Sequence, residues 1–175
     1  MPTFEVVPGL PPYGPMAIAF PTSGHGAHRQ GFVVRFSPKT GDPWVGNFQP
    51  GLTRFSGAYA HPDAMHVVVV SGGDIYVVDP EAKAAQELGG MVVSVTTLPE
   101  RSALLFDETL RLSLIDPTGL KWRTRRLSWD GIRNLSVAVD LIRGEGWRYD
   151  DTWHEFEVSL DAGDAKGGAY AGPQP

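Results

Sequence analysis

The chain contains no cysteine, and this absence removes several kinds of chemistry at once. Without thiols the chain forms no disulfide, has no thiol nucleophile and offers no thiolate ligand to a metal ion. A chain without disulfides also suits a reducing compartment. We therefore expect a cytoplasmic location.

The chain also lacks a long apolar run, a basic leader and an excess of positive charge. No apolar stretch is long enough to span a bilayer, and the N-terminus does not have the basic start and apolar core of a signal peptide. The formal net charge is −5, whereas a broad nucleic-acid surface needs surplus Lys and Arg to neutralise phosphates. The sequence therefore predicts neither a membrane partner nor a nucleic-acid partner.

Helical periodicity is almost absent, whereas glycine and proline are abundant. The 175 residues include 21 Gly and 15 Pro, which is typical of many short strands joined by tight turns. The length suits one domain, which we expect to span residues 1–162. The Gly- and Pro-rich segment 163–175 is predicted to be a flexible tail.

An internal period runs along most of the chain. Residues 58–80 correspond without a gap to residues 95–117, at a constant spacing of 37 residues. Weaker matches extend the period in both directions, at spacings of 42 and 45 residues. Four copies can be anchored, at Ser37, Asp79, Asp116 and Asp161. Such a period indicates repeated copies of one supersecondary unit.

Each copy has the pattern of four short antiparallel strands. In the clearest copy the strands are predicted at 53–60, 66–70, 74–79 and 84–88. Gly72-Gly73 supplies the positive φ of a tight turn, and Pro80 ends a strand because it has no N–H to donate. In the next copy we expect strands at 102–106, 110–115 and 122–127. Four strands at hairpin spacing have the size of one propeller blade.

The segment Asp74 to Glu81 resembles the blade motif of the WD-repeat and quinoprotein-like β-propeller families, in which a strand ends in Asp-Pro and a turn. The copies do not each end in Trp-Asp or start with Gly-His. The resemblance implies an all-β fold, a small β-propeller of about four antiparallel four-stranded blades. We expect Phe4 to Val7 to pair with the fourth copy and close the ring, which would remove exposed sheet edges. An incomplete propeller that dimerises, or a twisted β-sandwich, is the alternative.

The first copy departs from the repeat at a Gly-rich loop that contains His25 and His28. A metal site would need a third ligand, commonly a carboxylate or another His, and no motif supplies one. We therefore predict no metal and no cofactor. Departures from a repeat are good places to look for function, so both His residues remain candidate binding residues.

Two acidic turns occupy the same place in their copies. One contains Asp107 and Glu108, and the other contains Asp150 and Asp151. In the propeller interpretation they open on one face and form an acidic rim, which could steer a basic partner or merely keep the protein soluble. A paired-carboxylate glycosidase site is less well supported, because sequence neighbours on a turn seldom have the required separation.

Four of the five Trp lie between residues 122 and 153. We expect the side chains of Trp122 and Trp147 to be buried in the core between neighbouring copies. Trp129 and Asp130 lie on a connection between two copies, and Trp129 is the aromatic residue that we most expect to be exposed. Exposed aromatic residues, here with Trp153 in the same stretch, are typical of binding hot spots.

Two classes of function follow. The favoured one is a non-enzymatic module that binds a protein or peptide, with a basic partner suited to the acidic turns and an inhibitor or immunity protein as its narrower form. Its candidate binding residues are His25, His28, Asp107, Glu108, Trp129, Asp130, Asp150, Asp151 and Trp153. The alternative is a hydrolase whose His and acidic residues, with or without a metal, meet at the central opening of the propeller. No phosphate loop and no nucleophile-elbow motif is present in the sequence.

Overall fold

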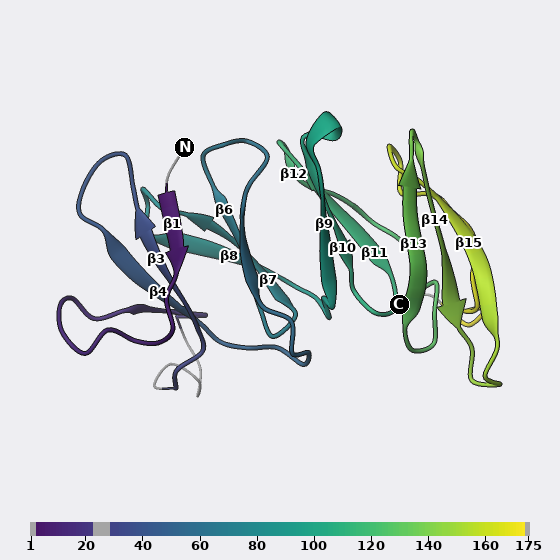
Figure 1. Ribbon diagram of the computed structural model, residues 1–175, viewed down its shortest axis with the longest axis horizontal. Coiled ribbons are helices and arrows are strands. Elements are labelled where there is room, and N and C mark those ends of the chain that lie inside the picture. The colour runs from purple at the N-terminus through teal and green to yellow at the C-terminus, as the bar shows by residue number, and fades with distance from the viewer. Residues whose placement is uncertain (1–2, 23–28, 174–175) are drawn as a thin grey trace. The chain divides into compact units, whose positions relative to one another are not determined.

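The computed structural model describes residues 3–22 and 29–173, and these residues form an all-β protein. They contain sixteen strands and one short 3-10 turn, η1 (Pro99–Arg101). Among the described residues no helix has the length and hydropathy that crossing a membrane would need. The strands belong to four sheets of four strands each. Figure 1 labels most of these strands along the chain. The predicted all-β, four-stranded units are confirmed.

Three sheets are simple antiparallel meanders, in which each strand pairs with the next one along the chain. The second sheet contains β5 (Gly57–Ala60), β6 (Val67–Ser71), β7 (Asp74–Asp79) and β8 (Ala84–Gly89). The third contains β9 (Ser94–Leu98), β10 (Ala103–Asp107), β11 (Leu112–Asp116) and β12 (Gly119–Arg123). The fourth contains β13 (Ile132–Ala138), β14 (Leu141–Trp147), β15 (Trp153–Ser159) and β16 (Ala165–Gly167).

The first sheet departs from this pattern. Its strands are β1 (Thr3–Val6), β2 (Ile18–Phe20), β3 (Phe32–Ser37) and β4 (Trp44–Phe48), in the spatial order β1-β3-β4-β2. The edge strand β2 runs parallel to β4, so the chain crosses over rather than turning back as a hairpin.

The 37-residue period corresponds to the strands of the second and third sheets. Asp79 ends β7 and Asp116 ends β11, and the strands before them follow in the same order. Gly72 and Gly73 form the β6–β7 turn with φ of 53° and 91°, as predicted from their sequence. The outer strand of the third sheet begins earlier than expected, at residue 119 instead of 122, because Gly119 adopts a positive φ and turns the chain back sooner.

The chain divides into two compact units. Unit 1 is Met1–Val93, with the first and second sheets, and unit 2 is Ser94–Pro175, with the third and fourth. The core of unit 1 is rich in aromatic side chains from both of its sheets, including Phe36, Phe48 and Tyr76. The core of unit 2 is mainly aliphatic, with Leu, Ile and Val from both of its sheets around Trp122. Each unit is therefore two sheets that share one core.

The N-terminal strand does not close a ring. β1 pairs antiparallel with β3 inside the first sheet (Figure 1), and the register places Phe4 opposite Phe36. The fourth sheet consists of β13 to β16 and does not include β1. The predicted pairing is wrong because Phe4 packs against the aromatic core of its own unit, which the strand can reach without a long loop closure.

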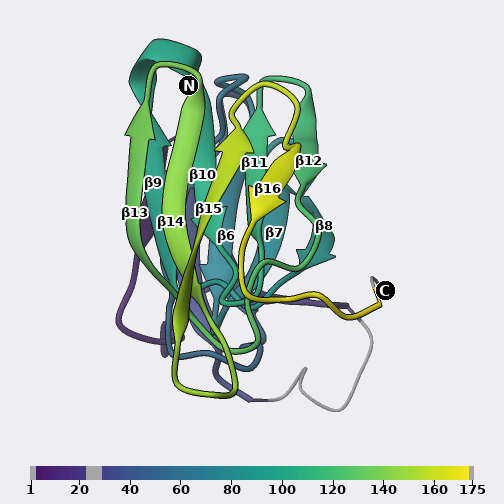
Figure 2. The same ribbon diagram turned by 90° about the vertical axis from the view of Figure 1, so that its right-hand side faces the viewer.

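The predicted tail contains a strand. β16 pairs with β15 and forms the edge of the fourth sheet, as Figure 2 shows, and Ala169 beyond it is buried. The backbone N–H groups of Gly168 and Ala169 donate to carbonyl groups of Glu155 and Leu127. Residues beyond 162 therefore take part in the pairing of the fourth sheet. Glycine allows this segment to approach the backbone closely, since a Cβ on Gly168 would lie 2.8 Å from Leu127 O.

Candidate functional site

The connection between β12 and β13 forms a tight platform that carries Trp129. The Ser128 hydroxyl donates to Gly131 O at 2.5 Å, and Trp129 N–H donates to Trp147 O at 2.9 Å. Gly131, with φ of 104°, accepts from the Trp147 N–H. These bonds hold the backbone that carries Trp129 against the end of β14.

The β14–β15 turn lies next to this platform. Trp147 and Trp153 face each other across the two strands, and the indole N–H of Trp147 donates to Asp151 Oδ1 at 3.2 Å. Asp150 accepts from the Thr152 hydroxyl, which, with the nearby charge of Arg148, holds the Asp150 pKa below its ordinary value. Asp150 therefore carries a negative charge at neutral pH.

The Trp129 ring contacts two other aromatic rings, Tyr149 and Tyr170, which come from separate segments of the chain. The Tyr149 ring lies edge-on to it at a centroid distance of 5.5 Å, and the Tyr170 ring is 4.8 Å away. The Arg126 guanidinium lies over both Trp129 and Tyr170, at 5.2 and 4.3 Å from their ring centroids. Arg148 lies 5.2 Å above Tyr149. These contacts order exposed side chains that would otherwise rotate freely.

The rings remain accessible to solvent. Trp129 is 36% exposed and Tyr149 is 63% exposed, and Asp130 and Asp150 beside them are exposed as well. We call the set Trp129, Asp130, Tyr149, Asp150 and Tyr170 the Trp129 surface. The predictions that Trp129 is exposed and that Trp122 is buried are confirmed, whereas Trp147 is only partly buried. Trp153 is also partly buried, with the Arg133 guanidinium 4.1 Å from its ring centroid.

Asp107 and Glu108 contribute no exposed carboxylate, although the sequence places them on an acidic rim. Both are almost fully buried. Glu108 accepts from the Ser113 hydroxyl at 2.5 Å and from Arg123 Nε at 3.0 Å. The turn does lie beside the Trp129 platform, because Gly131 N–H donates to Thr109 O. The sequence located this turn correctly, but the side chains face inward to internal partners.

Burial raises the pKa of Asp107 to about 6, and the adjacent Glu108 charge adds to this effect against the opposing hydrogen bond from Thr109 N–H. Among the described residues, no hydrogen bond or ion pair joins Asp107 or Glu108 to Asp150 or Asp151.

Another group of carboxylates lies on the exposed face of the fourth sheet. Glu145 and Glu155 are directly opposite each other on β14 and β15, beside a hollow of about 470 Å³. Hydrogen bonds from Arg133 and Asn134 lower the pKa of Glu145. A general acid needs a raised pKa, so Glu145 is poorly suited to glycosidase chemistry.

Unit 1 has a separate polar cluster in the β5–β6 turn. Asp63 lies between two imidazoles, with its Oδ1 3.0 Å from His61 Nδ1 and its Oδ2 2.6 Å from His66 Nδ1. Burial raises the pKa of Asp63, but the backbone N–H groups of His66 and Met65, the His66 side chain and the charge of His61 lower it further, so that it lies well below the usual range. His25 and His28, the histidines singled out from the sequence, lie outside the described residues.

Sequence reasoning missed three members of the exposed cluster. Tyr170 was assigned to the tail, and Arg126 and Arg148 were not singled out as site residues. Only the pairing of β16 with β15 brings Tyr170 to Trp129. The high density of Trp and Tyr after residue 122 was the available signal, and it pointed to the region where these rings lie.

The comparisons with known proteins do not assign the chain. No known protein-family model matches the sequence, and no curated protein matches it either.

Proposed function

We propose that this protein is a non-enzymatic module, built from blade repeats of the β-propeller kind, that binds a protein or peptide through the Trp129 surface. The observation that carries the proposal is the contact between the exposed rings of Trp129 and Tyr149 next to exposed carboxylates. Trp, Tyr and Arg are the residue types enriched in binding hot spots. Rings fixed in place before binding lose little entropy when a partner docks.

The chemistry of the surface favours a basic partner. Asp130 and Asp150 provide exposed carboxylates beside the rings, and these can pair with Lys and Arg side chains of a partner. The net charge of −5 adds a long-range attraction that speeds association with a cation-rich partner. An inhibitor or immunity protein acting on a basic target is the narrower form of this proposal.

The test is selection of peptides from a random display library on the intact chain. We expect the selected peptides to be rich in Lys and Arg and to bind more weakly as salt concentration rises. Trp129→Ala should weaken their binding at least about 10-fold, as expected for a hot-spot residue. Fluorescence anisotropy with labelled peptides would measure the change.

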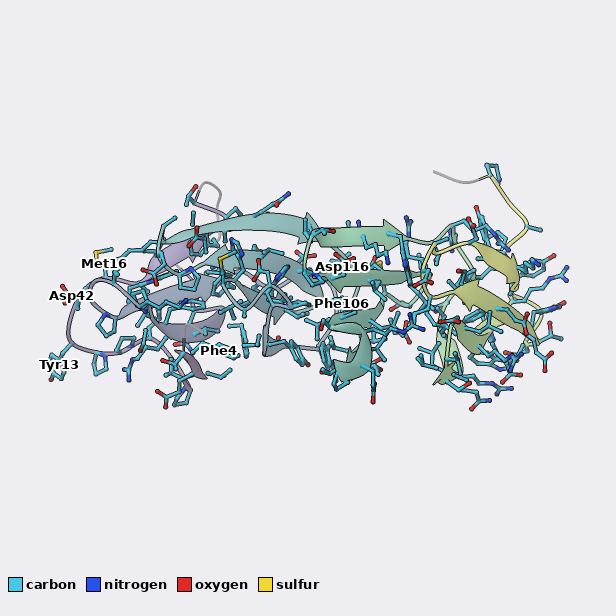
Figure 3. The ribbon with its side chains drawn as sticks, turned by 90° about the horizontal axis from the view of Figure 1, so that it is seen from above. Phe4, Tyr13, Met16, Asp42, Phe106 and Asp116 are labelled. Carbon is cyan, nitrogen blue, oxygen red and sulfur yellow. The ribbon has the colours of Figure 1, made fainter. Side chains whose placement is uncertain are left out.

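Tyr13→Ala provides the matched control. Tyr13 is 90% exposed on a loop of unit 1 and is labelled in Figure 3, so this variant removes an even more accessible aromatic side chain far along the sequence from the Trp129 surface. Its peptide affinity should equal that of the unmodified protein. Selection of no peptide, or equal losses in the two variants, would contradict the proposal.

A further inference from the structure

We propose that His61, Asp63 and His66 form a binding site for one divalent transition-metal ion, with Zn²⁺ as the best-suited ion. The site lies in the β5–β6 turn of unit 1 and shares no residue with the Trp129 surface. Each of the three residues offers one ligand atom, and these atoms all lie within 4.8 Å of one another.

The donor set selects the kind of ion. Two imidazoles and one carboxylate suit Zn²⁺ and its transition-metal neighbours, whereas Mg²⁺ and Ca²⁺ prefer oxygen ligands alone. Three protein ligands leave one position of a tetrahedral ion for water. This position would lie beside the partly exposed His66.

The distances are close to those that a bound ion requires. Tetrahedral Zn²⁺ with ligand bonds of about 2.0–2.1 Å holds its ligand atoms about 3.3 Å apart. The two imidazole Nδ1 atoms lie 3.0 and 2.6 Å from the Asp63 carboxylate oxygens. Side-chain rotations that move the ring nitrogens by less than about 1 Å would accommodate the ion, so the backbone can stay in place.

The contact between His61 and Asp63 also indicates a cation. His61 Nδ1 accepts a hydrogen bond from the Asp63 backbone N–H at 3.2 Å, so its lone pair is directed into the turn. The same nitrogen lies 3.0 Å from Asp63 Oδ1, which is itself an acceptor. A proton on the imidazole or a bound metal ion supplies the positive charge that this close contact needs, and the two compete for the same nitrogen.

The turn holds its ligands in place before any ion binds. Asp63 Oδ1 accepts from the backbone N–H groups of Met65 at 2.8 Å and His66 at 3.0 Å. His61 is almost fully buried, and its backbone N–H donates to His66 O. Ala64 takes a φ of 62°, which closes the turn tightly. Fixed ligands raise metal affinity, because less conformational entropy is lost on binding.

The site opens into a groove that could admit the ion and its water. The groove has a volume of about 480 Å³ and is lined by Lys39, Thr40, Met65, His66, Asp79 and Glu81. Carboxylates at its wall attract cations. His66 is the one ligand of the three that lines the groove.

Zn²⁺ titration of the full chain, after treatment with a chelator and dialysis, tests the proposal. Calorimetry should show one Zn²⁺ bound per chain, and Zn²⁺ should raise the melting temperature because it binds the folded turn. Affinity should fall as pH decreases, because protons compete for the imidazole nitrogens. Mg²⁺ at the same concentration should produce neither effect.

Two variants assign the binding to these residues. Asp63→Asn keeps a carbonyl oxygen for the N–H groups of Met65 and His66 but removes the charge, and His66→Ala removes the most exposed ligand. Each should weaken Zn²⁺ binding at least about 100-fold, more than the loss of an outer-shell group.

The controls remove histidines from other places. His154→Ala, at a partly exposed imidazole of unit 2, should leave Zn²⁺ binding unchanged. A His25→Ala and His28→Ala double variant should also bind normally. The proposal is overturned if Zn²⁺ does not bind, if Asp63→Asn and His66→Ala both bind it normally, or if only the double variant loses it.

Discussion

Unit 1 and unit 2 use the same construction with different side chains. In each unit, a tryptophan of one sheet donates its indole N–H to a backbone carbonyl in a turn of the other sheet. Trp44 donates to Pro80 O in unit 1, and Trp122 donates to Leu160 O in unit 2, both at 2.9 Å. The two tryptophans are the clearest correspondence between the units.

The differences lie in the cores and at the turns. Stacked and edge-on aromatic rings fill unit 1, whereas aliphatic side chains fill unit 2. The polar cluster of unit 1 is a His and Asp turn, and the exposed cluster of unit 2 is made of aromatic and Arg side chains. The comparison indicates that repeated strands preserve the scaffold, while connections between them are free to acquire separate chemistries.

The largest expected loss of stability follows removal of an aromatic ring from the core of unit 1. Phe48 is fully buried and its ring lies 5.2 Å from the rings of Phe20 and Tyr76. We expect Phe48→Ala to lower the free energy of unfolding by about 3–5 kcal/mol. Phe156→Ala, the matched change in unit 2, should cost less, because ring pairs add about 0.5–1.5 kcal/mol beyond buried area. Urea unfolding of both variants measures the difference, and an equal or larger loss for Phe156→Ala would show that the aromatic core adds no stability.

A second prediction concerns the residue that ends the inner strand of each meander. Ser71 ends β6 and its hydroxyl donates to Phe48 O, whereas the corresponding strand β10 ends in the buried Asp107. Burial raises the Asp107 pKa to about 6, so the folded state binds more protons than the unfolded state between about pH 4 and pH 6. The protonated Asp107 carboxyl therefore contributes its full stabilisation below about pH 4, and this contribution is lost as the pH rises to about 6 and beyond.

Asp107→Asn should therefore stabilise the protein at pH 7, by on the order of 2–3 kcal/mol, and flatten the dependence of unfolding free energy on pH between 4 and 6. The amide can still accept from Thr109 N–H through its oxygen. Asp150→Asn is the control, because that carboxyl is exposed. Urea unfolding at several pH values would measure both, and a pH dependence unchanged in Asp107→Asn would show that another group titrates.

The smallest predicted effect tests the tryptophan correspondence itself. Trp44→Phe and Trp122→Phe each keep an aromatic ring but leave a buried carbonyl, Pro80 O or Leu160 O, without its indole donor. Each variant should lose about 1–3 kcal/mol of unfolding free energy, the cost of an unsatisfied buried polar group. The two losses should agree within about 1 kcal/mol if the contacts are equivalent. Thermal unfolding of the two single variants measures them, and a loss in only one would break the correspondence.

The fold could be predicted from the sequence to the extent that its signals are local. Turn residues such as Gly72-Gly73 and Pro80, with β-branched runs between them, determine strands over a few residues, and a repeated spacing shows that the strands recur. The first sheet was not predictable in this way. Its parallel edge strand depends on which distant segment packs best on the aromatic core, and no local pattern encodes that choice.

The candidate site shows the same limit. The exposed position of Trp129 follows from its place between two copies, and the sequence predicted it. The inward direction of the Asp107 and Glu108 side chains cannot be predicted from the sequence. It depends on buried partners such as Ser113 and Arg123, which donate to Glu108 and which the turn residues alone do not reveal. The His61, Asp63 and His66 cluster is close in sequence, but its convergence depends on a positive φ at Ala64 that a non-glycine residue rarely adopts.

By itself, the sequence determined an all-β chain of four strand-rich copies, their turns and the region with most aromatic residues. These properties arise from local backbone preferences and spacing, which each segment carries with it. The tertiary structure decided that β1 joins β3, that β16 brings Tyr170 to Trp129 and that two acidic side chains point inward. Those outcomes depend on burial and on partners distant in sequence, whose energies exist only once the sheets have packed.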